Sequence, residues 1–278
     1  MQKIKSYAKV NLFLKITRRL LGFHKLYSLV VQINLYDEIL IKENKLNKNV
    51  LISSGKFKIN NQNNTIINLI NLMKKEFIVL RNKNFTIHIK KNIPNGSGLG
   101  GASSNATAIF SFFKRKYKLK ISVKKSKHLL SKIGKDCPMF LNKKVKLIKS
   151  SGEKFTEFNK KLNLQMLLIF PYINLSTERV FSRLIKISKI SKNKDINLRD
   201  MKKLIKTCKL YGNDLLHPAV KILPKLKKLI NLIKEINNNN FYSMTGSGSA
   251  FFIIFNKKKH LLNAQKMIKK QRDSLWTK

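Results

Sequence analysis

The chain has 278 residues, of which 43% are hydrophobic and 9% aromatic, so it can bury the core of one large or two ordinary domains. Lys and Arg number 59 and Asp and Glu 13, a formal net charge of +46, but the apolar content excludes an intrinsically disordered chain. Two cysteines, Cys137 and Cys208, exclude a disulfide scaffold and a four-cysteine zinc site. No apolar run reaches the roughly 18 residues of a membrane span, and no signal-peptide cleavage site is seen. We therefore expect a cytoplasmic protein without a membrane partner.

The positive charge comes from 51 Lys and only 8 Arg, spread over the whole chain among many Ile and Asn. Proteins that recognise phosphates and bases favour Arg for its bidentate geometry. Lys, Asn and Ile share A/T-rich codons, so mutational bias explains the charge. A selected nucleic-acid-binding surface is the alternative, and we expect no nucleic-acid partner.

Hydrophobic periodicity predicts a mixture of strands and helices in the first half of the chain, and no repeat of 20 to 50 residues is present. In chain order we expect strands at 4–16 and 30–41, a polar turn at 60–64, a helix at 65–80, a strand at 84–90, a glycine-rich turn at 94–101, helices at 103–113 and 123–133, and a loop at 136–141.

The second half continues in the same mixed way. In chain order we expect a strand at 145–151, a linker at 159–163, a strand at 164–170, helices at 177–188, 200–210 and 219–236, a strand at 251–255 after a second glycine turn, and a helix at 260–271. Strands and helices do not alternate regularly, which favours an α+β fold over a doubly wound sheet.

The segment 94–104 reads P-N-G-S-G-L-G-G-A-S-S and leads directly into a predicted helix. Its four glycines permit positive φ angles and a close approach of the backbone to a ligand. The unpaired N–H groups and the dipole at the start of the helix favour an anion. Ser103 and Ser104 add hydroxyl donors and can cap the helix. The segment therefore predicts a phosphate-binding loop.

Other phosphate loops fit this segment poorly. Gly96, Gly98 and Gly101 match G-x-G-x-x-G, but the next acidic residue is Asp136, too far away for a dinucleotide-binding fingerprint. A Walker loop needs Lys at the position of Ala102, and the downstream motifs of protein kinases are absent. A simple tight turn before a capped helix remains the alternative, although four glycines in six residues disfavour it.

The core of this loop resembles the phosphate loop of the GHMP kinases, and four further segments of that family follow its order along the chain. They are Ala8–Leu14, Gly22-Phe23-His24, Gly134–Phe140 and Thr245–Ala250. The resemblance implies a two-domain α+β fold, with an N-terminal domain like ribosomal protein S5 domain 2 at residues 1–160 and a ferredoxin-like C-terminal domain at 161–278. It also implies transfer of a phosphoryl group from ATP, accompanied by Mg²⁺.

Within the family, the Gly22-Phe23-His24 triplet resembles the corresponding segment of the members that bind a cytosine ring. The implied small-molecule substrate is 4-diphosphocytidyl-2-C-methyl-D-erythritol, phosphorylated at its 2-hydroxyl in the non-mevalonate route to isoprenoid precursors. Another GHMP kinase, acting on mevalonate or homoserine, is the first alternative. A basic nucleic-acid-binding protein without enzymatic activity is the second.

The resemblance also assigns catalytic and ATP-binding residues. Asp136 is the only carboxylate between Glu76 and Glu153, and is expected to be the base that takes the hydroxyl proton, with Lys9 as its partner. A turn or capping Asp and a solvated surface Lys are the structural alternatives. ATP is expected to bind Pro94, Asn95, Gly96, Ser97, Gly98, Leu99, Gly100, Gly101, Ala102, Ser103 and Ser104, with Asn64 near the adenine.

The remaining implied residues would bind the second substrate; they are Asn11, Phe23, His24, Thr177, Phe181, Gly246 and Gly248. Phe23 stands where the family commonly has Tyr, so any hydrogen bond from that hydroxyl is lost. A structural His at position 24 and a simple turn at 246–248 stay open as alternatives. Nothing in the sequence indicates that Cys137 is a nucleophile. The segment Asn213-Asp214-Leu215 is interpreted as the start of a helix. The histidines lack the spacing of metal ligands.

Overall fold

The structure, a computed structural model, describes residues 2–20, 23–59, 64–149, 152, 154–184, 187–188, 196–271 and 275–278. Its contacts divide the chain into two compact units. The first unit comprises Met1–Lys9, Gln32–Asn95 and Gly100–Lys143, and the second comprises Val10–Val31, Gly96–Leu99 and Lys144–Lys278. The predicted domains, 1–160 and 161–278, stay a prediction.

Two long strands, β1 (Gln2–Leu20) and β2 (Phe23–Asn44), contribute residues to both units. In the first unit, β4 (Asn84–Lys91) pairs antiparallel with the second half of β2 and parallel with β3 (Val50–Gly55). The predicted alternation of β4 is confirmed, because Phe85, Ile87 and Ile89 are buried and the residues between them are half-exposed.

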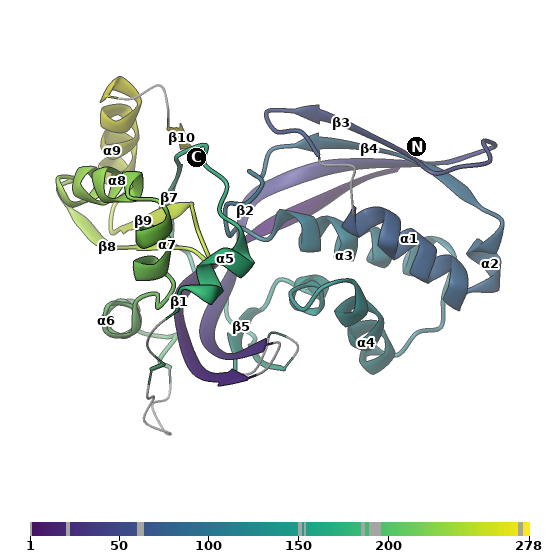
Figure 1. Cartoon of the computed structure of the whole chain (residues 1–278), viewed down its shortest axis with the longest axis horizontal. Coiled ribbons are helices and arrows are strands. Elements are labelled where there is room, and N and C mark those ends of the chain that lie inside the picture. Colours follow the sequence, from purple (N-terminus) through teal and green to yellow (C-terminus); the bar gives the residue numbers. More distant parts are fainter. Residues whose placement is uncertain are drawn as a thin grey trace. The chain divides into compact units, whose positions relative to one another are not determined.

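Three helices cover one face of this part of the sheet, as Figure 1 shows; they are α1 (Thr65–Glu76), α3 (Gly101–Lys116) and α4 (Val123–Ile133). Their apolar faces and the buried side chains of β2 and β4 form one core that includes Ile39, Ile87 and Phe110. Because the sheet and α3 share this core, the end of β4 and the start of α3 are held on either side of the glycine-rich segment.

The first unit corrects three predictions. The helix predicted at 65–80 is two helices, because Phe77 is extended (φ −133°) between α1 and the short α2 (Ile78–Arg81). The loop predicted at 136–141 contains a 3₁₀ helix, η1 (Cys137–Leu141), with Pro138 in its first turn. Helix α3 begins at Gly101 with Gly100 as its N-cap, so Ser103 and Ser104 lie inside the first turn and do not cap it.

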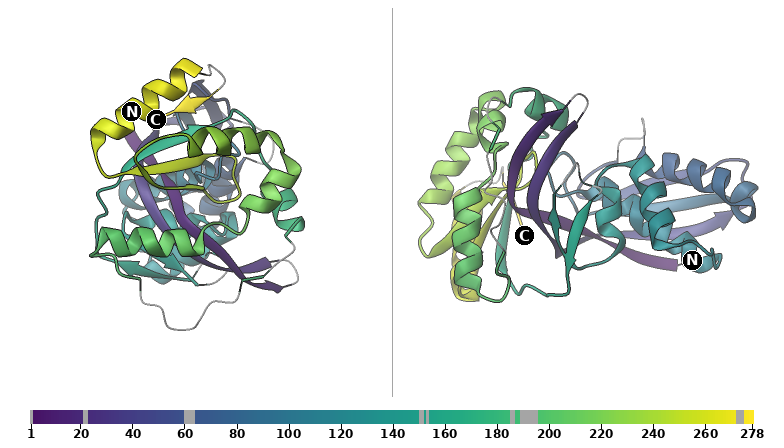
Figure 2. Two further views of the ribbon diagram at one scale, coloured as in Figure 1. Left: turned by 90° about the vertical axis from the view of Figure 1, so that its left-hand side faces the viewer. Right: turned by 90° about the horizontal axis from the view of Figure 1, so that it is seen from below.

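The second unit contains a four-stranded antiparallel sheet. Its strand order is β10 (Trp276–Thr277), β7 (Gln165–Phe170), β9 (Phe251–Phe255) and β8 (Asn239–Met244). Figure 2 shows the helices α8 (Lys225–Lys234) and α9 (Lys258–Gln271) on one face of this sheet. Alternate residues of β7 and β9 point into the core beneath these helices.

Two further strands, β5 (Val145–Ile148) and β6 (Phe155–Phe158), belong to the second unit. Strand β5 pairs antiparallel with the first half of β2 and with β6. The helix α6 (Met201–Tyr211) lies close to its predicted bounds. The mixed α+β architecture predicted from the sequence is confirmed.

Two helices of the second unit are shorter than predicted. Within the described residues, the helix predicted at 177–188 covers only α5 (Thr177–Ser182). The helix predicted at 219–236 is interrupted between α7 (Leu216–Ile222) and α8. Leu223 and Pro224 separate α7 from α8, since a proline cannot continue the hydrogen bonding of the preceding helix. Among the described residues, no helix is both long and apolar enough to cross a membrane.

Candidate active site

The glycine-rich segment 94–104 connects β4 to α3. Gly96, Gly98 and Gly100 have φ angles of +56°, +76° and +73°, in the left-handed region where a side chain is disfavoured. Three of its four glycines therefore serve the backbone conformation, as expected for a loop that brings N–H groups close to a ligand.

The start of α3, in the first unit, has no side-chain cap, because its N-cap residue is Gly100. The hydroxyl of Ser104 is already engaged: it donates to the carbonyl of Tyr7 and accepts from Ser6, both at 2.7 Å. Ser103 is half-buried and Ala102 is exposed. This first turn can thus present N–H groups and a positive dipole end to an anion.

Lys9 is a buried lysine that lies against this helix start. Its side chain is only 4% exposed, and a Cβ atom added to Gly100 would lie 3.2 Å from both Cγ and Cε of Lys9. Burial lowers the pKa of the Lys9 ammonium, and the carboxylate of Asp136 opposes this by raising the pKa. The solvated-surface alternative for Lys9 is therefore wrong, and the structure brings Lys9, Gly100 and Asp136 together within the first unit.

Asp136 is half-buried and directly precedes η1, yet its side chain does not cap that helix. A residue of α3, Thr107, fixes the position of η1. Its hydroxyl lies 2.8 Å from the carbonyl oxygen of Cys137 in η1 and 2.9 Å from that of Ser103 in α3. The packing of η1 on α3 thus places the carboxylate of Asp136 where it acts electrostatically on the buried ammonium of Lys9. This arrangement suits a base in proton transfer.

Cys137 adjoins Asp136 but is not a nucleophile. Its thiol is fully buried, and burial raises its pKa to about 11, while burial raises that of Cys208 to about 12. We predict that iodoacetamide at neutral pH modifies neither thiol in the folded protein, whereas both react after unfolding in guanidinium. Mass spectrometry of the two samples measures this, and rapid labelling of Cys137 in the folded state would contradict it.

The second unit brings the two glycine motifs of the sequence side by side. The N–H groups of Ala250 and Ser249 donate to the carbonyls of Ser97 and Gly96 at 3.1 and 3.3 Å. A Cβ atom on Gly98 would lie 2.1 Å from the carbonyl oxygen of Thr245. The nearest obstacle to a side chain at position 98 is therefore the second glycine motif, whose Gly246 and Gly248 also have positive φ angles.

Several predicted substrate residues meet in the second unit. The rings of His24 and Phe181 lie 4.9 Å apart between centroids, with an angle of 41°. The hydroxyls of Thr177 and Ser247 are 2.9 Å apart. The backbone N–H of Asn11 donates to the hydroxyl of Thr245 at 3.0 Å. The second glycine motif thus contacts residues from β1 and α5. Gly22 and the side chain of Phe23 lie outside the described residues.

The two remaining ATP-side residues have structural contacts. The side chain of Asn64 caps α1 by accepting from the N–H of Ile66 at 2.9 Å, and that of Asn95 donates to the carbonyl of Lys58. A role of Asn64 near adenine stays a prediction. In the part of the chain that the structure describes, no three His, Cys, Asp or Glu residues group as metal ligands.

The Asn213-Asp214-Leu215 segment, read above as a helix start, does more than precede α7. The amide of Asn213 donates to the carbonyls of Met244 and Gly246 at 2.7 and 2.9 Å. Asp214 accepts from the N–H of Ile16 at 2.8 Å. These contacts fix the second glycine motif and β1 in the second unit. Sequence reasoning missed them, since neither residue belongs to a periodic pattern.

Comparison with known proteins gives concordant results. The family model for the GHMP kinases N terminal domain matches residues 64–143. The chain is 31% identical to the 4-diphosphocytidyl-2-C-methyl-D-erythritol kinase of Pelagibacter ubique, over 99% of this chain and 96% of the relative. It is 33% identical to the protein of the same name from Buchnera aphidicola, over 94% of this chain and 88% of that one.

Solved structures show the same fold. A crystal structure of 4-(cytidine 5'-diphospho)-2C-methyl-D-erythritol kinase superposes with a TM-score of 0.77 at 23% identity, covering 99% of this chain and 98% of that one. A mevalonate kinase structure follows, with a TM-score of 0.73 at 16% identity and coverage of 100% and 98%. At such identities the likeness concerns the fold alone.

Proposed function

Because the chain belongs to the 4-diphosphocytidyl-2-C-methyl-D-erythritol kinases, a branch of the GHMP kinases, we propose that it phosphorylates that compound at its 2-hydroxyl. ATP supplies the γ-phosphoryl group, and the products are the 2-phosphate and ADP. The reaction belongs to the non-mevalonate route of isoprenoid precursor synthesis. The single observation that carries the chemistry is the grouping of Lys9, Gly100 and Asp136 in the first unit.

In this reaction the carboxylate of Asp136 takes the proton from the 2-hydroxyl as the oxygen attacks the γ-phosphorus. The bond between that phosphorus and the β,γ-bridging oxygen breaks, and ADP leaves. The ammonium of Lys9 stabilises the negative charge of the transferred group. The uncapped N–H groups at the start of α3 bind the phosphates.

Mg²⁺, when bound with ATP, neutralises phosphate charge and needs few protein ligands, because phosphates and water complete its coordination. The half-buried hydroxyl of Ser103, in the first turn of α3, is the side chain we assign to it. The expectations of a cytoplasmic location and of no nucleic-acid partner stay predictions.

For the second substrate we assign the cytosine to His24 and Phe181, whose rings already contact each other. An aromatic face and a ring nitrogen suit a base, which offers a π-face and hydrogen-bonding edges. Thr177, Asn11, Gly246 and Gly248 are assigned to the rest of that substrate.

We expect His24→Ala to raise the KM for the diphosphocytidyl substrate while leaving the KM for ATP nearly unchanged. Stacking and hydrogen bonds to a base contribute roughly 1 to 3 kcal/mol, so kcat/KM should fall about 5- to 150-fold. Steady-state kinetics and a thermal melt of the one variant measure this. His260→Ala, at a histidine in α9, is the matched control and should leave both KM values unchanged. An unchanged substrate KM with a lower melting temperature in His24→Ala would instead make His24 a structural residue.

The proposed reaction is tested by supplying ATP and Mg²⁺ with one candidate alcohol at a time. The diphosphocytidyl substrate, mevalonate and homoserine are the three arms, and ADP release is the readout. We expect ADP only with the first, together with a new phosphomonoester signal in ³¹P NMR. Faster turnover of mevalonate or homoserine would assign the chain a different GHMP kinase substrate.

A further inference from the structure

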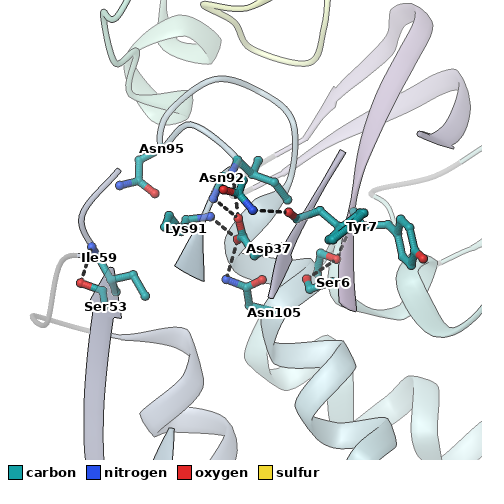
Figure 3. A network of polar contacts seen from close by, with 12 residues as sticks. Ser6, Tyr7, Asp37, Ser53, Ile59, Lys91, Asn92, Asn95 and Asn105 are labelled. Atoms are coloured by element: carbon teal, nitrogen blue, oxygen red, sulfur yellow. Dashed lines mark hydrogen bonds and ion pairs between the residues drawn. The ribbon is translucent and has the colours of Figure 1, made fainter. Parts of the chain in front are cut away.

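Asp37, near the middle of β2, is a buried carboxylate that none of the assigned roles uses. Its exposed fraction is 0%, and it accepts four hydrogen bonds within the first unit (Figure 3). The ammonium of Lys91 donates at 2.5 Å, the N–H groups of Asn92 and Ile93 each at 2.8 Å, and the side-chain amide of Asn105 at 3.0 Å. A carboxylate has about four acceptor positions, so this one is saturated.

The four donors lie on both sides of the glycine-rich segment. Lys91, Asn92 and Ile93 are the last three residues before Pro94, and Asn105 lies in α3 just after Ser104. One carboxylate therefore joins the end of β4, which enters the segment, to the helix that leaves it. The side chain of Asn92 adds a further link to β2, because it donates to the carbonyl of Tyr36 at 2.9 Å.

Two details indicate that this network sets the position of α3. A Cβ atom on Gly101, the first residue of the helix, would lie 2.8 Å from the ammonium nitrogen of Lys91, so the helix start packs directly on the ion pair. The Oδ1 atom of Asn105 is buried and has no hydrogen-bond partner among the described residues. The amide of Asn105 is therefore oriented by its bond to Asp37, which leaves that oxygen unsatisfied.

Stability alone is a weak explanation for such a network. Lys91 is 3% exposed and Asp37 0%, and burying two charges costs more than packing apolar side chains of similar size in their place. Both residues also occupy core-facing positions of alternating strands, where Ile39 and Ile89 are their apolar neighbours on the same face. A buried ion pair at such positions is best explained by a requirement for one defined geometry.

We propose that Asp37 is a positioning residue for the phosphate loop: through Lys91, Asn92, Ile93 and Asn105 it fixes the spacing between the two ends of the segment 94–104. This inference rests on the proposed function, since it concerns how that segment holds the phosphates of ATP. The carboxylate itself touches neither substrate. Its effect should therefore appear in the binding of ATP and hardly in that of the second substrate.

The test is Asp37→Asn, which preserves the shape of the side chain and removes its charge and half of its acceptor capacity. The introduced amide nitrogen would face N–H donors, so the loop ends separate. We expect the KM for ATP and the calorimetric Kd for ATP to rise roughly 10- to 100-fold, since a displacement of about 1 Å in a binding site can cost 100-fold. The KM for the diphosphocytidyl substrate should stay within about threefold of wild type.

A second pair of variants separates positioning from stability. Lys91→Met in the Asp37→Asn background removes the ammonium that would otherwise be buried without its partner. The double variant should regain much of the melting temperature lost in Asp37→Asn. It should keep the raised KM for ATP, because the N–H groups of Asn92 and Ile93 still lack a carboxylate. A purely structural role of Asp37 predicts that the KM recovers together with the melting temperature.

The matched control is Glu43→Gln, on the same strand β2 and in the same unit. Glu43 accepts from Lys83 at 2.6 Å and from the hydroxyl of Tyr117 at 3.1 Å, far along β2 from the glycine-rich segment. We expect a lower melting temperature in this variant, with the KM for ATP unchanged. It shows what the loss of a carboxylate in this sheet does when no loop depends on it.

The inference is overturned if the KM for ATP stays within about threefold of wild type in both Asp37→Asn and the double variant. If neither variant folds, Asn105→Ala decides, because it cuts only the link to α3; an unchanged KM for ATP there overturns the inference as well. Failure of the wild-type protein to bind ATP would count against the proposed function instead, so the two failures can be told apart.

Discussion

Asp136→Asn is expected to remove most turnover while leaving the affinity for ATP nearly intact. The amide preserves the shape of the side chain but cannot take a proton, and a positioned base contributes typically about 10² to 10⁴ in rate. The structure strengthens this expectation, because the carboxylate of Asp136 acts on the buried ammonium of Lys9 and does not cap η1. Steady-state kinetics gives kcat, and calorimetry gives the Kd for ATP.

Asp200→Asn is the matched control for this variant. Asp200 caps α6 by accepting from the N–H of Lys203 at 3.1 Å, and Asn is an equally good cap, so neither stability nor turnover should change. If Asp136→Asn kept more than roughly a tenth of the wild-type kcat, Asp136 would not be the base. A loss of ATP affinity as large as the loss of kcat would point to a disturbed loop instead.

Gly98→Ala is expected to weaken ATP binding strongly, even though it adds only one methyl group. That methyl carbon would lie 2.1 Å from the carbonyl oxygen of Thr245, and the φ angle of +76° disfavours any side chain. The segment 96–99 must then separate from the second glycine motif, so the phosphate loop loses its geometry. We expect the Kd for ATP to rise about 100-fold or more, the effect of misplacing a binding group by about 1 Å.

Gly212→Ala separates the clash from the backbone strain. Gly212 also has a positive φ angle, +59°, but a Cβ atom there would meet nothing within 4 Å. Both variants carry a backbone penalty on the order of 1 to 3 kcal/mol, and only Gly98→Ala displaces Thr245. We expect Gly212→Ala to lower the melting temperature with the Kd for ATP unchanged. Equal Kd values for ATP in the two variants would rule out the clash as the cause.

The clash changes the reason for requiring glycine at position 98. From the sequence, the glycines of this segment are expected to permit positive φ angles and a close approach of the backbone to a ligand. In the structure, the carbonyl of Thr245 is the nearest atom to an added Cβ, and Ala250 donates to the carbonyl of Ser97. The two glycine motifs are about 150 positions apart in the sequence. No local pattern could predict that they pack against each other.

The local pattern of apolar residues determined most of the elements. Strand β4 and helix α4 have nearly the predicted bounds, because the alternation of Phe85, Ile87 and Ile89 and the spacing of Leu129 and Leu130 reflect one buried face. Strands β3, β6, β8 and β10 were missed, since each is short and none shows a clear alternation. Their residues are held as strands by pairing with neighbours, a tertiary effect.

The residues of the candidate site likewise divide into those that the sequence identified and those that only the structure revealed. The glycine-rich segment, Lys9 and Asp136 could be named from the sequence, because charged residues and glycines stand out in an apolar strand or a short loop. The resemblance to the GHMP kinases then supplied their roles. Asp37 and Lys91 carried a usable signal that the sequence reading passed over: each places a charge on the apolar side of an alternating strand.

The sequence by itself determined which residues can do chemistry and which loop can bind phosphate, because these depend on residue type and local backbone freedom. Only the tertiary structure shows that Lys9 is buried near Asp136 and that a side chain at position 98 would clash with Thr245. It also shows that hydrogen bonds to Asp37 link β4 to α3. The residue pairs involved lie 54 to 147 positions apart in the sequence. Burial, desolvation and hydrogen-bond saturation arise only when such segments pack, so they are properties of the fold and not of any local stretch.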